Sequence, residues 1–564
     1  MLKKVRDNKY TPYIVIILLG IIICFPLFTL NIARTGEYFL HAFRIVSVKE
    51  CIADGVFPPL INYKHMNGFG YGINIFYGIF TTYIPILISY FTNSIDLSIK
   101  IFALLSVIFS GITMYWFVHN LTKNKTIGLV SALIYMSAPY KITNIYERCA
   151  LGEYVAFIFI PLVFNGLYYL MNKNRKGSII LILGTSLLIF THTITTIYTA
   201  IFVVIFLLFN VKKIKNIFFW KELLISLLLI LAITSVYTIP LIEHKLDAEY
   251  AVFNAKSMHA TKEDVWENTN SPAEWFKLIP APPGKMDFSF GIPIIFLLLI
   301  TLITYKKVDK KYKRIYNISI ALSILSLIMC TKLFPWKSMP HFLTIIQFAW
   351  RTQGFFILFI SIVCGINAHV LTESLSKIKT RNIVFVVMII FISALFQISN
   401  KFIKQPYERE RIEDTVAKYD RIGVYNINRD YMPIKAYNVR DWIMEREDRT
   451  YINSGNATIK NENKDKLYDK MEIEVIVNVE LELPYLYYLG YTTILNGEKI
   501  ENYESENGML AVKVDTSGIL EVKYEGTIFE KIGYIISLVG IMGLIGIVFY
   551  NKRNNLEEDL ERKS

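Results

Sequence analysis

The sequence predicts a polytopic α-helical membrane protein with about twelve spans and a small extracytoplasmic β-rich domain before the last span. Of the 564 residues, 53% are hydrophobic and only 19% are charged, which lies outside the range of soluble globular chains. The apolar residues gather in runs close to the length that a membrane helix needs. Residues 400–530 interrupt these runs with a charged and polar stretch that carries strand patterns.

The basic residues predict which loops face the cytoplasm. A formal net charge of +13 would suggest a nucleic-acid partner for a soluble protein. Here Lys and Arg lie in short loops between apolar runs, and cytoplasmic loops carry such an excess, so we expect no nucleic acid. The patches predicted to be cytoplasmic are Lys3/Lys4/Arg6/Lys9, Lys123/Lys125, Lys173/Arg175/Lys176, Lys212/Lys213/Lys215, Lys306 to Arg314, Lys377/Lys379/Arg381 and Lys552/Arg553.

Parity then selects the spans, because neighbouring cytoplasmic patches must be joined by an even number of crossings. The predicted spans are 13–33, 98–118, 126–138, 154–171, 178–191, 194–210, 218–240, 291–305, 314–333, 350–371, 382–399 and 531–550. Both termini are then cytoplasmic. The predicted domains are a transmembrane domain (1–399), an extracytoplasmic β-sandwich-like domain (400–530), and a final helix with a cytoplasmic tail (531–564).

The apolar run 71–91 breaks this pattern, since it would invert every later loop if it crossed the membrane. We therefore expect an interfacial or re-entrant segment on the outer side. Its glycines, Pro85 and many tyrosines suit the headgroup level, where aromatic residues are enriched.

The stretch Thr35 to Arg44 places three ionisable residues directly after the first span. Spacings of four and three put Glu37, His41 and Arg44 on one face if the stretch is helical. Charges at a helix end can simply meet water, but ionisable residues near a bilayer mark function more often than those on a soluble surface. The same predicted side of the membrane holds Glu147, Arg148, Glu153, His192 and Arg351.

Each of these outer residues also has a structural interpretation. Glu147, Arg148 and Glu153 fit a solvated turn, and a lone histidine such as His192 is more often hydrogen-bonded structure than a site. Arg351 either holds a phosphate through its forked donors or reaches the lipid headgroups as a snorkelling side chain.

Two patterns predict that the polar region folds as a small β-sandwich. Between Glu472 and Glu482 the sequence alternates as a half-buried strand does. Its apolar side consists of Ile473, Val475, Val477, Val479 and Leu481, with Ile476 out of place on the other side. Asn496-Gly497 follows a second β-rich run and is typical of a hairpin turn.

Several kinds of site find no support in the sequence. It contains no phosphate-binding glycine loop, HExxH motif or nucleophile elbow, so soluble-type hydrolase and nucleotidase functions have no positive signal. The five cysteines are scattered without a CxxC motif, which argues against a zinc or redox site.

Several segments along the chain carry a family resemblance. GEYFLHAFRI, DGVFPPLIN, NGFGYGINIFYG and YIPILI together resemble the start of bacterial membrane proteins labelled 6-pyruvoyl-tetrahydropterin synthase-related. IYERCALGEYVAFIFIPLVF, THT and QFAWR look like later parts of that pattern, and the polar tail resembles that of YfhO-type proteins. The resemblance covers most of the chain and is most specific over 35–165. These families are similar in plan to GT-C glycosyltransferases, which take sugars from polyprenyl-phosphate carriers.

The resemblance implies roles for the outer residues. In the GT-C fold an acidic residue of the first external loop, usually aspartate, is the catalytic base or a metal ligand. Glu37 stands at that position, four residues before the histidine, so a longer carboxylate replaces the usual aspartate; Leu40 also replaces a more usual phenylalanine. The pterin label implies no pterin chemistry here, because no zinc-type histidine cluster accompanies it.

The implied function is transfer of a sugar from a polyprenyl-phosphate donor to a cell-envelope polymer or lipid acceptor. Glu37 would accept a proton from the acceptor hydroxyl, and Arg351 with Arg44 or Arg148 would bind the phosphate. Glu147 or Glu153 would bind a divalent cation or sugar hydroxyls, and His41 and His192 complete the predicted substrate-binding set.

Two other functions stay open at the level of sequence. One is a transporter or flippase of lipid-linked sugars, and the other is a non-catalytic scaffold for envelope assembly. Transporters typically show internal repeats and midplane charges, whereas here the charges collect on one side and no repeat is visible, which favours transfer chemistry.

Overall fold

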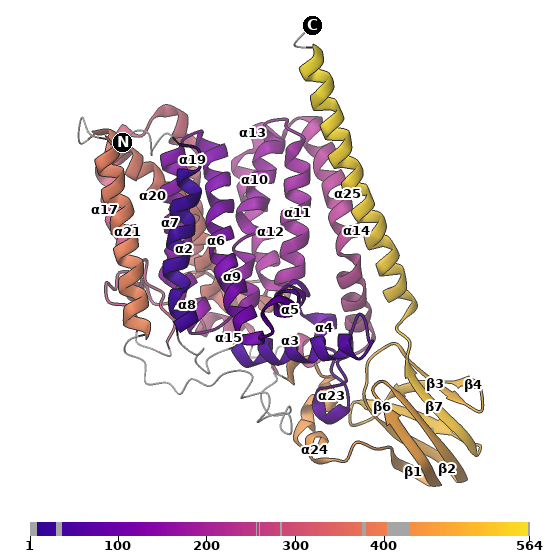
Figure 1. Cartoon of the computed structure of the whole chain (residues 1–564). Coiled ribbons are helices and arrows are strands. Elements are labelled where there is room, and N and C mark those ends of the chain that lie inside the picture. Colours follow the sequence, from indigo (N-terminus) through magenta and orange to yellow (C-terminus); the bar gives the residue numbers. More distant parts are fainter. Residues whose placement is uncertain are drawn as a thin grey trace.

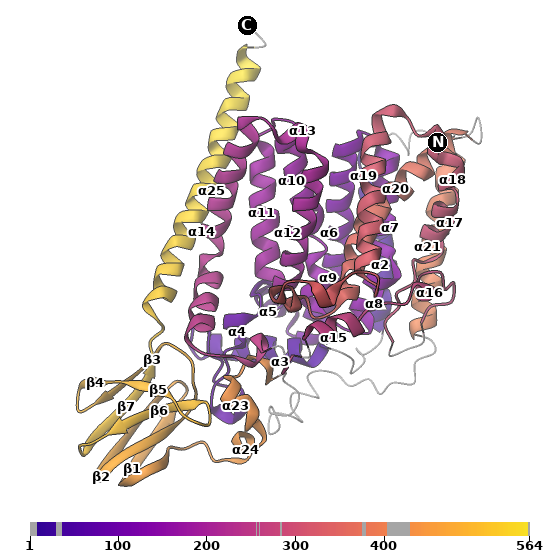
Figure 2. The ribbon, with the colours of Figure 1, turned by 180° about the vertical axis from the view of Figure 1, so that it is seen from behind.

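The computed structural model describes residues 8–29, 37–254, 256–258, 260–281, 285–374, 379–402 and 429–561. A bundle of helices stands on one side and an antiparallel sheet lies beyond one end of it (Figures 1 and 2). Both chain termini lie at the end of the bundle opposite the sheet. The predicted basic residues before Asn8, Lys377 and the segment 403–428 lie outside the described residues.

Long apolar helices build the bundle. Polar caps start several of them; for example, Asn124 Oδ1 accepts the N–H groups of Thr126 and Ile127 at the start of α7. The bundle helices are α2 (Thr11–Thr29), α6 (Ile95–Thr122), α7 (Lys125–Ser137), α10 (Ile160–Met171), α11 (Lys176–Thr191), α12 (Thr193–Phe209), α14 (Ile217–Asp247), α17 (Ile292–Leu299), α18 (Thr301–Thr304), α19 (Lys310–Met329), α20 (Gln353–Ser374), α21 (Lys379–Phe402) and α25 (Ile528–Glu561).

Six stretches among the described residues are long and apolar enough to cross a membrane, which indicates a membrane protein. They are Thr11–Thr29, Ile95–Thr122, Leu151–Met171, Ile217–Asp247, Ala349–Glu373 and Ile528–Arg553. Five further apolar helices have only 10–17 residues. The predicted count of about twelve spans is therefore not confirmed.

The predicted span 291–305 is broken in the structure. Helix α17 ends at Leu299, α18 covers Thr301–Thr304, and a 3₁₀ turn, η3 (Tyr305–Lys307), follows. The Asn367 side chain explains the break, because its Nδ2 donates to the Leu297 carbonyl at 3.0 Å and to Thr301 Oγ1 at 2.9 Å. A side chain that takes a carbonyl from the helical ladder interrupts the helix at that point.

Short helices cover the end of the bundle that faces the sheet (Figure 1). They are α3 (Tyr38–Ala53), α4 (Ile73–Phe76), α5 (Phe80–Thr92), α8 (Pro139–Tyr146) and α9 (Leu151–Ala156). With 13 residues, α5 is about 20 Å long and too short to cross a hydrocarbon core of about 30 Å. It lies at the sheet end of the bundle, and the interfacial position predicted for 71–91 stays a prediction.

The remaining short elements lie in the connections. They are η1 (Met66–Gly68), α13 (Val211–Ile214), η2 (Ala251–Phe253), α15 (Lys262–Glu267), α16 (Pro272–Trp275), η4 (Trp336–Ser338), η5 (His341–Ile346), η6 (Ala349–Thr352), η7 (Arg429–Tyr431), α23 (Ile434–Asn438) and α24 (Arg440–Glu445).

Seven strands form one antiparallel sheet in the order β4-β3-β7-β2-β6-β5, with β1 paired to β2. The strands are β1 (Tyr451–Asp465), β2 (Tyr468–Leu486), β3 (Tyr491–Leu495), β4 (Glu498–Ile500), β5 (Asn502–Glu504), β6 (Met509–Val514) and β7 (Gly518–Tyr524). The structure thus shows a β-rich domain whose strands are joined in one hydrogen-bonded sheet, and the sandwich arrangement stays a prediction. The Asn496-Gly497 hairpin is confirmed, with both residues at positive φ between β3 and β4.

The predicted strand 472–482 lies within β2, but its burial differs from the prediction at one position. Ile473, Val479 and Leu481 are buried as expected, whereas Val477 is 58% exposed. β7 pairs with β2 up to Ile473 and β6 pairs with it from Val479 on, so the middle of β2 is paired with β1 alone. Without a neighbour on the other side, Val477 remains on the surface.

Polar contacts join the sheet to the bundle end. Lys464 Nζ, on β1, donates to the Gly68 carbonyl at 2.8 Å. Lys466 Nζ, between β1 and β2, donates to the carbonyl of Asp54, directly after α3, at 2.9 Å. The sheet is thus anchored beside the segment that carries α3.

Candidate active site

Four charged side chains from separate segments meet at the sheet end of the bundle. Glu37 directly precedes α3, Arg148 follows α8, Glu153 lies on α9, and Arg351 lies on η6. The Glu37 backbone N–H donates to the Arg148 carbonyl at 2.6 Å, which ties α3 to the α8–α9 connection. We call these four residues the charged cluster.

The charges of the cluster alternate in sign. Arg148 Nη2 lies 2.9 Å from Glu37 Oε1, and Arg148 Nη1 lies 2.7 Å from Glu153 Oε2. Arg351 Nε lies 3.5 Å from the same Glu153 oxygen. Glu153 is 4% exposed and Arg351 is 8% exposed, so the desolvation of each charge must be offset by its partners.

Two residues of α8 that were not predicted from the sequence support the cluster. The Tyr140 hydroxyl donates to Glu153 Oε1, which also accepts a 3.3 Å hydrogen bond from Asn144 Nδ2. Asn144 Oδ1 accepts from Arg148 Nη1 at 2.8 Å. Tyr140 and Asn144 are four residues apart and precede Arg148, so the helical spacing was a signal that could have identified them.

Aromatic rings cover the arginines. The Arg148 guanidinium carbon lies 4.9 Å from the centre of the Trp350 ring, and that of Arg351 lies 4.8 Å from the centre of the Phe348 ring. Such contacts stabilise a desolvated cation by about 0.5–2 kcal/mol. The QFAWR segment therefore contributes its aromatic residues as well as Arg351.

Glu37 and His41 form a pair one helical turn apart. His41 Nε2 lies 3.6 Å from Glu37 Oε2, and His41 is 2% exposed while Glu37 is 33% exposed. The low-polarity surroundings favour a neutral acid, but His41 and the positive charge of Arg148 outweigh them and hold the pKa of Glu37 far below its ordinary value. Burial lowers the pKa of His41, so the pair consists of a carboxylate beside a neutral imidazole.

His192 reaches the cluster from the turn between α11 and α12. Its Nδ1 accepts the Thr195 N–H, which caps the start of α12. Gly152 makes room for the ring, because a Cβ there would lie 2.7 Å from His192 Cδ2 and 2.7 Å from the Tyr77 hydroxyl. Low-polarity surroundings and the positive charge of Arg351 lower the pKa of His192 to about 4.

Arg44, which was predicted among the substrate ligands, makes its hydrogen bonds outside the cluster. Its Nε donates to Asn74 Oδ1 at 2.9 Å, and its Nη atoms donate to the Tyr77 and Gly78 carbonyls. Its guanidinium and the His41 ring both pack on the Tyr77 ring, so the predicted common helix face exists. Arg44 thus fixes the backbone between α4 and α5.

Glu147, which was also predicted at the site, directly precedes Arg148. It is buried at the C-terminal end of α8, and it is its neighbour Arg148 that pairs with both carboxylates. The residues that the structure brings together are therefore Glu37, His41, Arg148, Glu153, His192 and Arg351.

Two buried nitrogens point to an occupant of the site. His41 Nε2 and Arg351 Nε have no hydrogen-bond partner among the residues that the structure describes, although each lies near a carboxylate. A buried polar atom without a hydrogen bond costs about 1–3 kcal/mol, which a ligand oxygen would relieve.

The carboxylates of the cluster are the side chains that could bind the predicted divalent cation. Over the described ranges, no group of three or more His, Cys, Asp or Glu side chains is arranged to hold a metal ion. Arg148 bridges Glu37 and Glu153, the two carboxylates that would otherwise offer oxygen ligands. The donor set present therefore does not fit a metal centre at this position.

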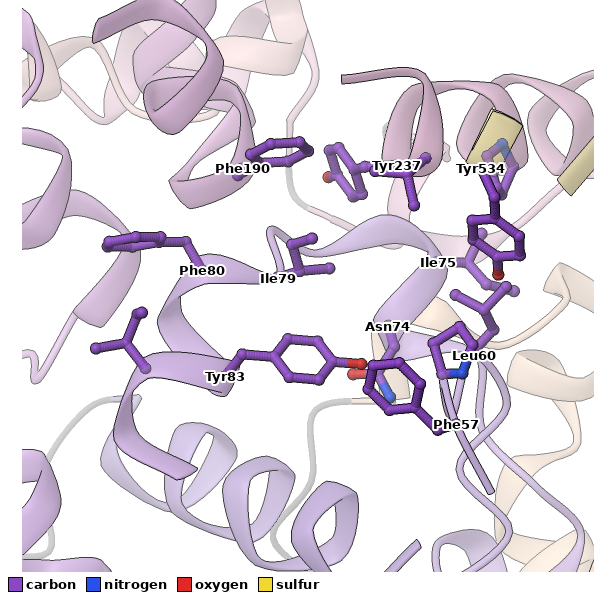
Figure 3. A pocket seen from close by; sticks show the side chains of 14 residues that line it. Phe57, Leu60, Asn74, Ile75, Ile79, Phe80, Tyr83, Phe190, Tyr237 and Tyr534 are labelled. Atoms are coloured by element: carbon purple, nitrogen blue, oxygen red, sulfur yellow. The ribbon is translucent and has the colours of Figure 1, made fainter. Parts of the chain in front are cut away.

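A cavity of about 480 Å³ lies next to the site (Figure 3). Its walls come from the segment 57–84, the end of α11, α14 and α25. The labelled side chains in Figure 3 are almost all aromatic or aliphatic, with Asn74 as the polar exception besides the tyrosine hydroxyls.

Comparisons with known proteins leave the family open. No protein-family model matches the chain. An uncharacterized protein of Lactococcus lactis subsp. cremoris (strain MG1363) is 26% identical over 356 residues, which cover 60% of this chain and 56% of that protein. The chain thus spans little more than half the length of this relative, and the resemblance to 6-pyruvoyl-tetrahydropterin synthase-related and YfhO-type proteins stays a prediction.

One solved structure aligns over much of the chain. It is the archaeal oligosaccharyltransferase AglB from Archaeoglobus fulgidus, in complex with an inhibitory peptide and a dolichol-phosphate. The alignment covers 76% of this chain and 61% of that chain, with 10% identity and a TM-score of 0.41. At this score the likeness carries no conclusion about function.

Proposed function

We propose that the protein is a GT-C-like membrane glycosyltransferase that moves a sugar from a polyprenyl-phosphate donor to a cell-envelope polymer or lipid acceptor. The observation that supports this most is the charged cluster, in which two arginines and two carboxylates from four segments meet at one end of the bundle. The proposed location is the cell membrane, with the cluster and the sheet on the outer side and both termini in the cytoplasm.

The arginines provide the phosphate-binding part of the proposal. A guanidinium matches two phosphate oxygens with its forked donors, and it stabilises the negative charge that develops on a leaving phosphate. Arg351 is suited to this role because its Nε has no hydrogen bond among the described residues. Arg148 lies on the other side of Glu153 and adds a second positive charge.

Glu37 is the proposed base, with His41 as its partner. As the acceptor oxygen bonds to the anomeric carbon of the sugar, Glu37 takes the hydroxyl proton. The bond from that carbon to the phosphate oxygen breaks, and the lipid phosphate leaves with the electron pair. The depressed pKa keeps Glu37 ionised and ready to accept, but it also makes the carboxylate a weak base.

The test is sugar transfer by the full chain in proteoliposomes that contain a radiolabelled polyprenyl-phosphate sugar and a membrane extract as acceptor. Glu37→Gln keeps the size of the side chain and should reduce transfer by about 10²- to 10⁴-fold. Because the variant loses the ion pair with Arg148, it should also melt at a lower temperature, and transfer is compared at a temperature at which both proteins are folded. Equal transfer by the variant and the parent would remove Glu37 from the role of base. No transfer by the parent would leave the proposed function without support.

A scaffold function is the second candidate, because every member of the cluster already has an ionic partner within it. Under this alternative the cluster would only hold α3, α8, α9 and η6 together. Glu37→Gln would then lower the melting temperature, and neither the parent nor the variant would transfer sugar.

A further inference from the structure

A second cavity, of about 350 Å³, lies between α17, α18, α19 and α20, and we call it the α19 groove. It lies at the break between α17 and α18, because Leu298, Thr301 and Leu302 line it. With 8 residues α17 is only about 12 Å long, so it is too short to cover α19 and α20, which have 20 and 22 residues. The groove shares no lining residue with the cavity in Figure 3.

The two long helices each turn an apolar face towards the α19 groove. Residues four and three positions apart lie on one face of a helix. The residues with this spacing in the lining are Ile320, Ile324 and Leu327 on α19 and Phe356, Ile360 and Val363 on α20. The walls of the groove are therefore suited to a hydrocarbon chain.

The two polar residues of the lining already have hydrogen-bond partners. Ser323 Oγ donates to the Ser319 carbonyl at 2.7 Å. Thr301 Oγ1 accepts from Asn367 Nδ2 at 2.9 Å and donates to the Leu297 carbonyl at 3.4 Å. A hydrocarbon chain in the groove would leave neither of these hydroxyls without a partner.

The α19 groove opens on an apolar surface of the bundle. Leu302 is 86% exposed and Ile324 is 52% exposed, although both line the groove. Large exposed apolar side chains on the long helices of a membrane protein belong against lipid rather than water. A lipid can therefore enter the groove from the side.

Two lysines share one indole ring just beyond the end of α19. Lys332 Nζ lies 4.0 Å and Lys337 Nζ lies 4.2 Å from the centre of the Trp266 ring. Both lysines are exposed, and neither forms an ion pair with a carboxylate of the described part of the chain. Two like charges this close repel each other, and an anion between them would offset the repulsion.

These lysines lie at the sheet end of the groove. Leu327 lines the groove, and Lys332 follows it by five residues. The Asn270 N–H donates to the Cys330 carbonyl at 2.7 Å, which ties the segment of α15 and α16 to the end of α19. Phe276, directly after α16, also lines the groove, and both short helices lie at the sheet end of the bundle (Figure 2). A headgroup at the lysines and a chain in the groove can therefore belong to one molecule.

We infer that the α19 groove binds an acyl chain of a glycerophospholipid with a net negative headgroup, whose phosphate lies between Lys332 and Lys337. A zwitterionic headgroup would bring a cation of its own beside the two lysines, so the charges favour an anionic lipid. Tryptophan and lysine are also typical of the headgroup level of a membrane. This lipid differs from the donor of the proposed reaction and does not depend on it.

The experiment is photo-crosslinking of the full chain in phosphatidylcholine nanodiscs. One arm contains a trace of phosphatidylglycerol with a diazirine on its acyl chain, and the other contains phosphatidylcholine with the same modified chain. We expect phosphatidylglycerol to label the peptides that contain Phe276, 320–327 and 356–363 at least about fivefold more strongly. Equal labelling of these peptides by the two lipids would overturn the inference.

The double variant Lys332→Gln with Lys337→Gln tests the headgroup site. It should reduce labelling by phosphatidylglycerol to the level of phosphatidylcholine. Lys499→Gln with Lys513→Gln is the matched control, because it removes two exposed lysines of the sheet, and Lys513 also lies over an aromatic ring, that of Tyr503. An equal loss of label in both double variants would show an effect of net charge alone and would overturn the headgroup assignment.

Two variants from different helices fill the α19 groove. Ile324→Trp and Leu298→Trp should each reduce labelling by phosphatidylglycerol, and agreement between them separates blocking from local misfolding. The control is Ile328→Trp, on the same helix as Ile324, because Ile328 is 38% exposed and lies outside the lining. Full labelling of both groove variants would overturn the inference. Loss of label to excess polyprenyl phosphate, but not to excess phosphatidylglycerol, would assign the groove to the donor lipid and would overturn it as well.

Discussion

Arg148 is the residue on which the charged cluster depends, because its guanidinium contacts carboxylates from two segments. Arg148→Ala leaves Glu153, which is 4% exposed, with Arg351 at 3.5 Å as its ionic partner in the cluster. Breaking a buried pair from one side costs about 3–5 kcal/mol, so the melting temperature of the purified protein should fall clearly. Arg148→Ala combined with Glu153→Gln should recover part of that loss.

Lys460→Ala is the control for Arg148. Lys460 also pairs with a glutamate, Glu474, at 2.7 Å, but the two side chains are 49% and 60% exposed. A pair of this kind contributes about 0–1 kcal/mol, so the control should melt close to the parent. If both variants melt alike, the charged cluster is no more important for stability than a surface ion pair.

Asp469 makes the stability of the sheet depend on pH. It is buried on β2, and burial together with the negative charge of Glu462 raises its pKa to about 7. In the unfolded chain an aspartate titrates near about 3.9, so the folded state binds the proton more tightly between these values. This contribution to stability is complete below about pH 4 and is lost as the pH rises through about 7.

Asp469→Asn should therefore melt at a higher temperature than the parent at pH 8, and the difference should shrink towards pH 5. The measurement is the melting temperature of parent and variant across this range. Asp465→Asn, at an exposed carboxylate of the same hairpin, is the control. A constant difference between Asp469→Asn and the parent at every pH would contradict the assigned titration.

At the scale of elements, α14 and α25 lie so close together that glycine is needed between them. A Cβ at Gly540 would lie 2.7 Å from the Ile233 backbone nitrogen and 2.9 Å from the Ala232 carbonyl carbon. Gly540→Ala should push the helices apart and lower the melting temperature. A Cβ at Gly546, on the same helix, would have no described atom within 4 Å, so Gly546→Ala should be neutral or stabilising by up to about 1 kcal/mol.

The elements show which parts of the fold are predictable from sequence. Apolar runs and the Asn496-Gly497 hairpin follow from local patterns, and the structure agrees with both. The run 71–91 forms the short helices α4 and α5 at the sheet end of the bundle, and its interfacial position stays a prediction. The break after α17 depends on Asn367, which is some 70 residues away in the chain. The exposure of Val477 depends on where β6 and β7 end. Such contacts have no local signal.

The same distinction applies to the site. Topology alone brought Glu37, Arg148, Glu153, His192 and Arg351 to one side. Which carboxylate pairs with which arginine depends on how α3, α8, α9 and η6 pack. Tertiary packing also explains why Arg44 donates to the Tyr77 and Gly78 carbonyls. Trp350 directly precedes Arg351, which was predicted at the site. Its contact with the Arg148 guanidinium is a tertiary contact that the sequence does not predict.

At the scale of the whole molecule, the charged cluster and the sheet share one end of the bundle, and both termini lie at the other (Figures 1 and 2). Because of this arrangement, the predicted orientation decides which side of the membrane the cluster and the sheet face. If the termini are cytoplasmic, the cluster, the cavity and the sheet all face outward. The proposed reaction needs this, because its acceptor belongs to the cell envelope.

Cysteine labelling in intact cells tests the orientation. All five native cysteines are buried, so they should contribute little background. Glu498→Cys, exposed on β4, should react with a membrane-impermeant maleimide added from outside, whereas Lys212→Cys, exposed on α13 at the opposite end, should react only after permeabilisation. If both cysteines were labelled from outside, they would lie on the same side of the membrane, and the predicted set of spans would be wrong. The reverse pattern would place the cluster in the cytoplasm, where a cell-envelope acceptor cannot reach it.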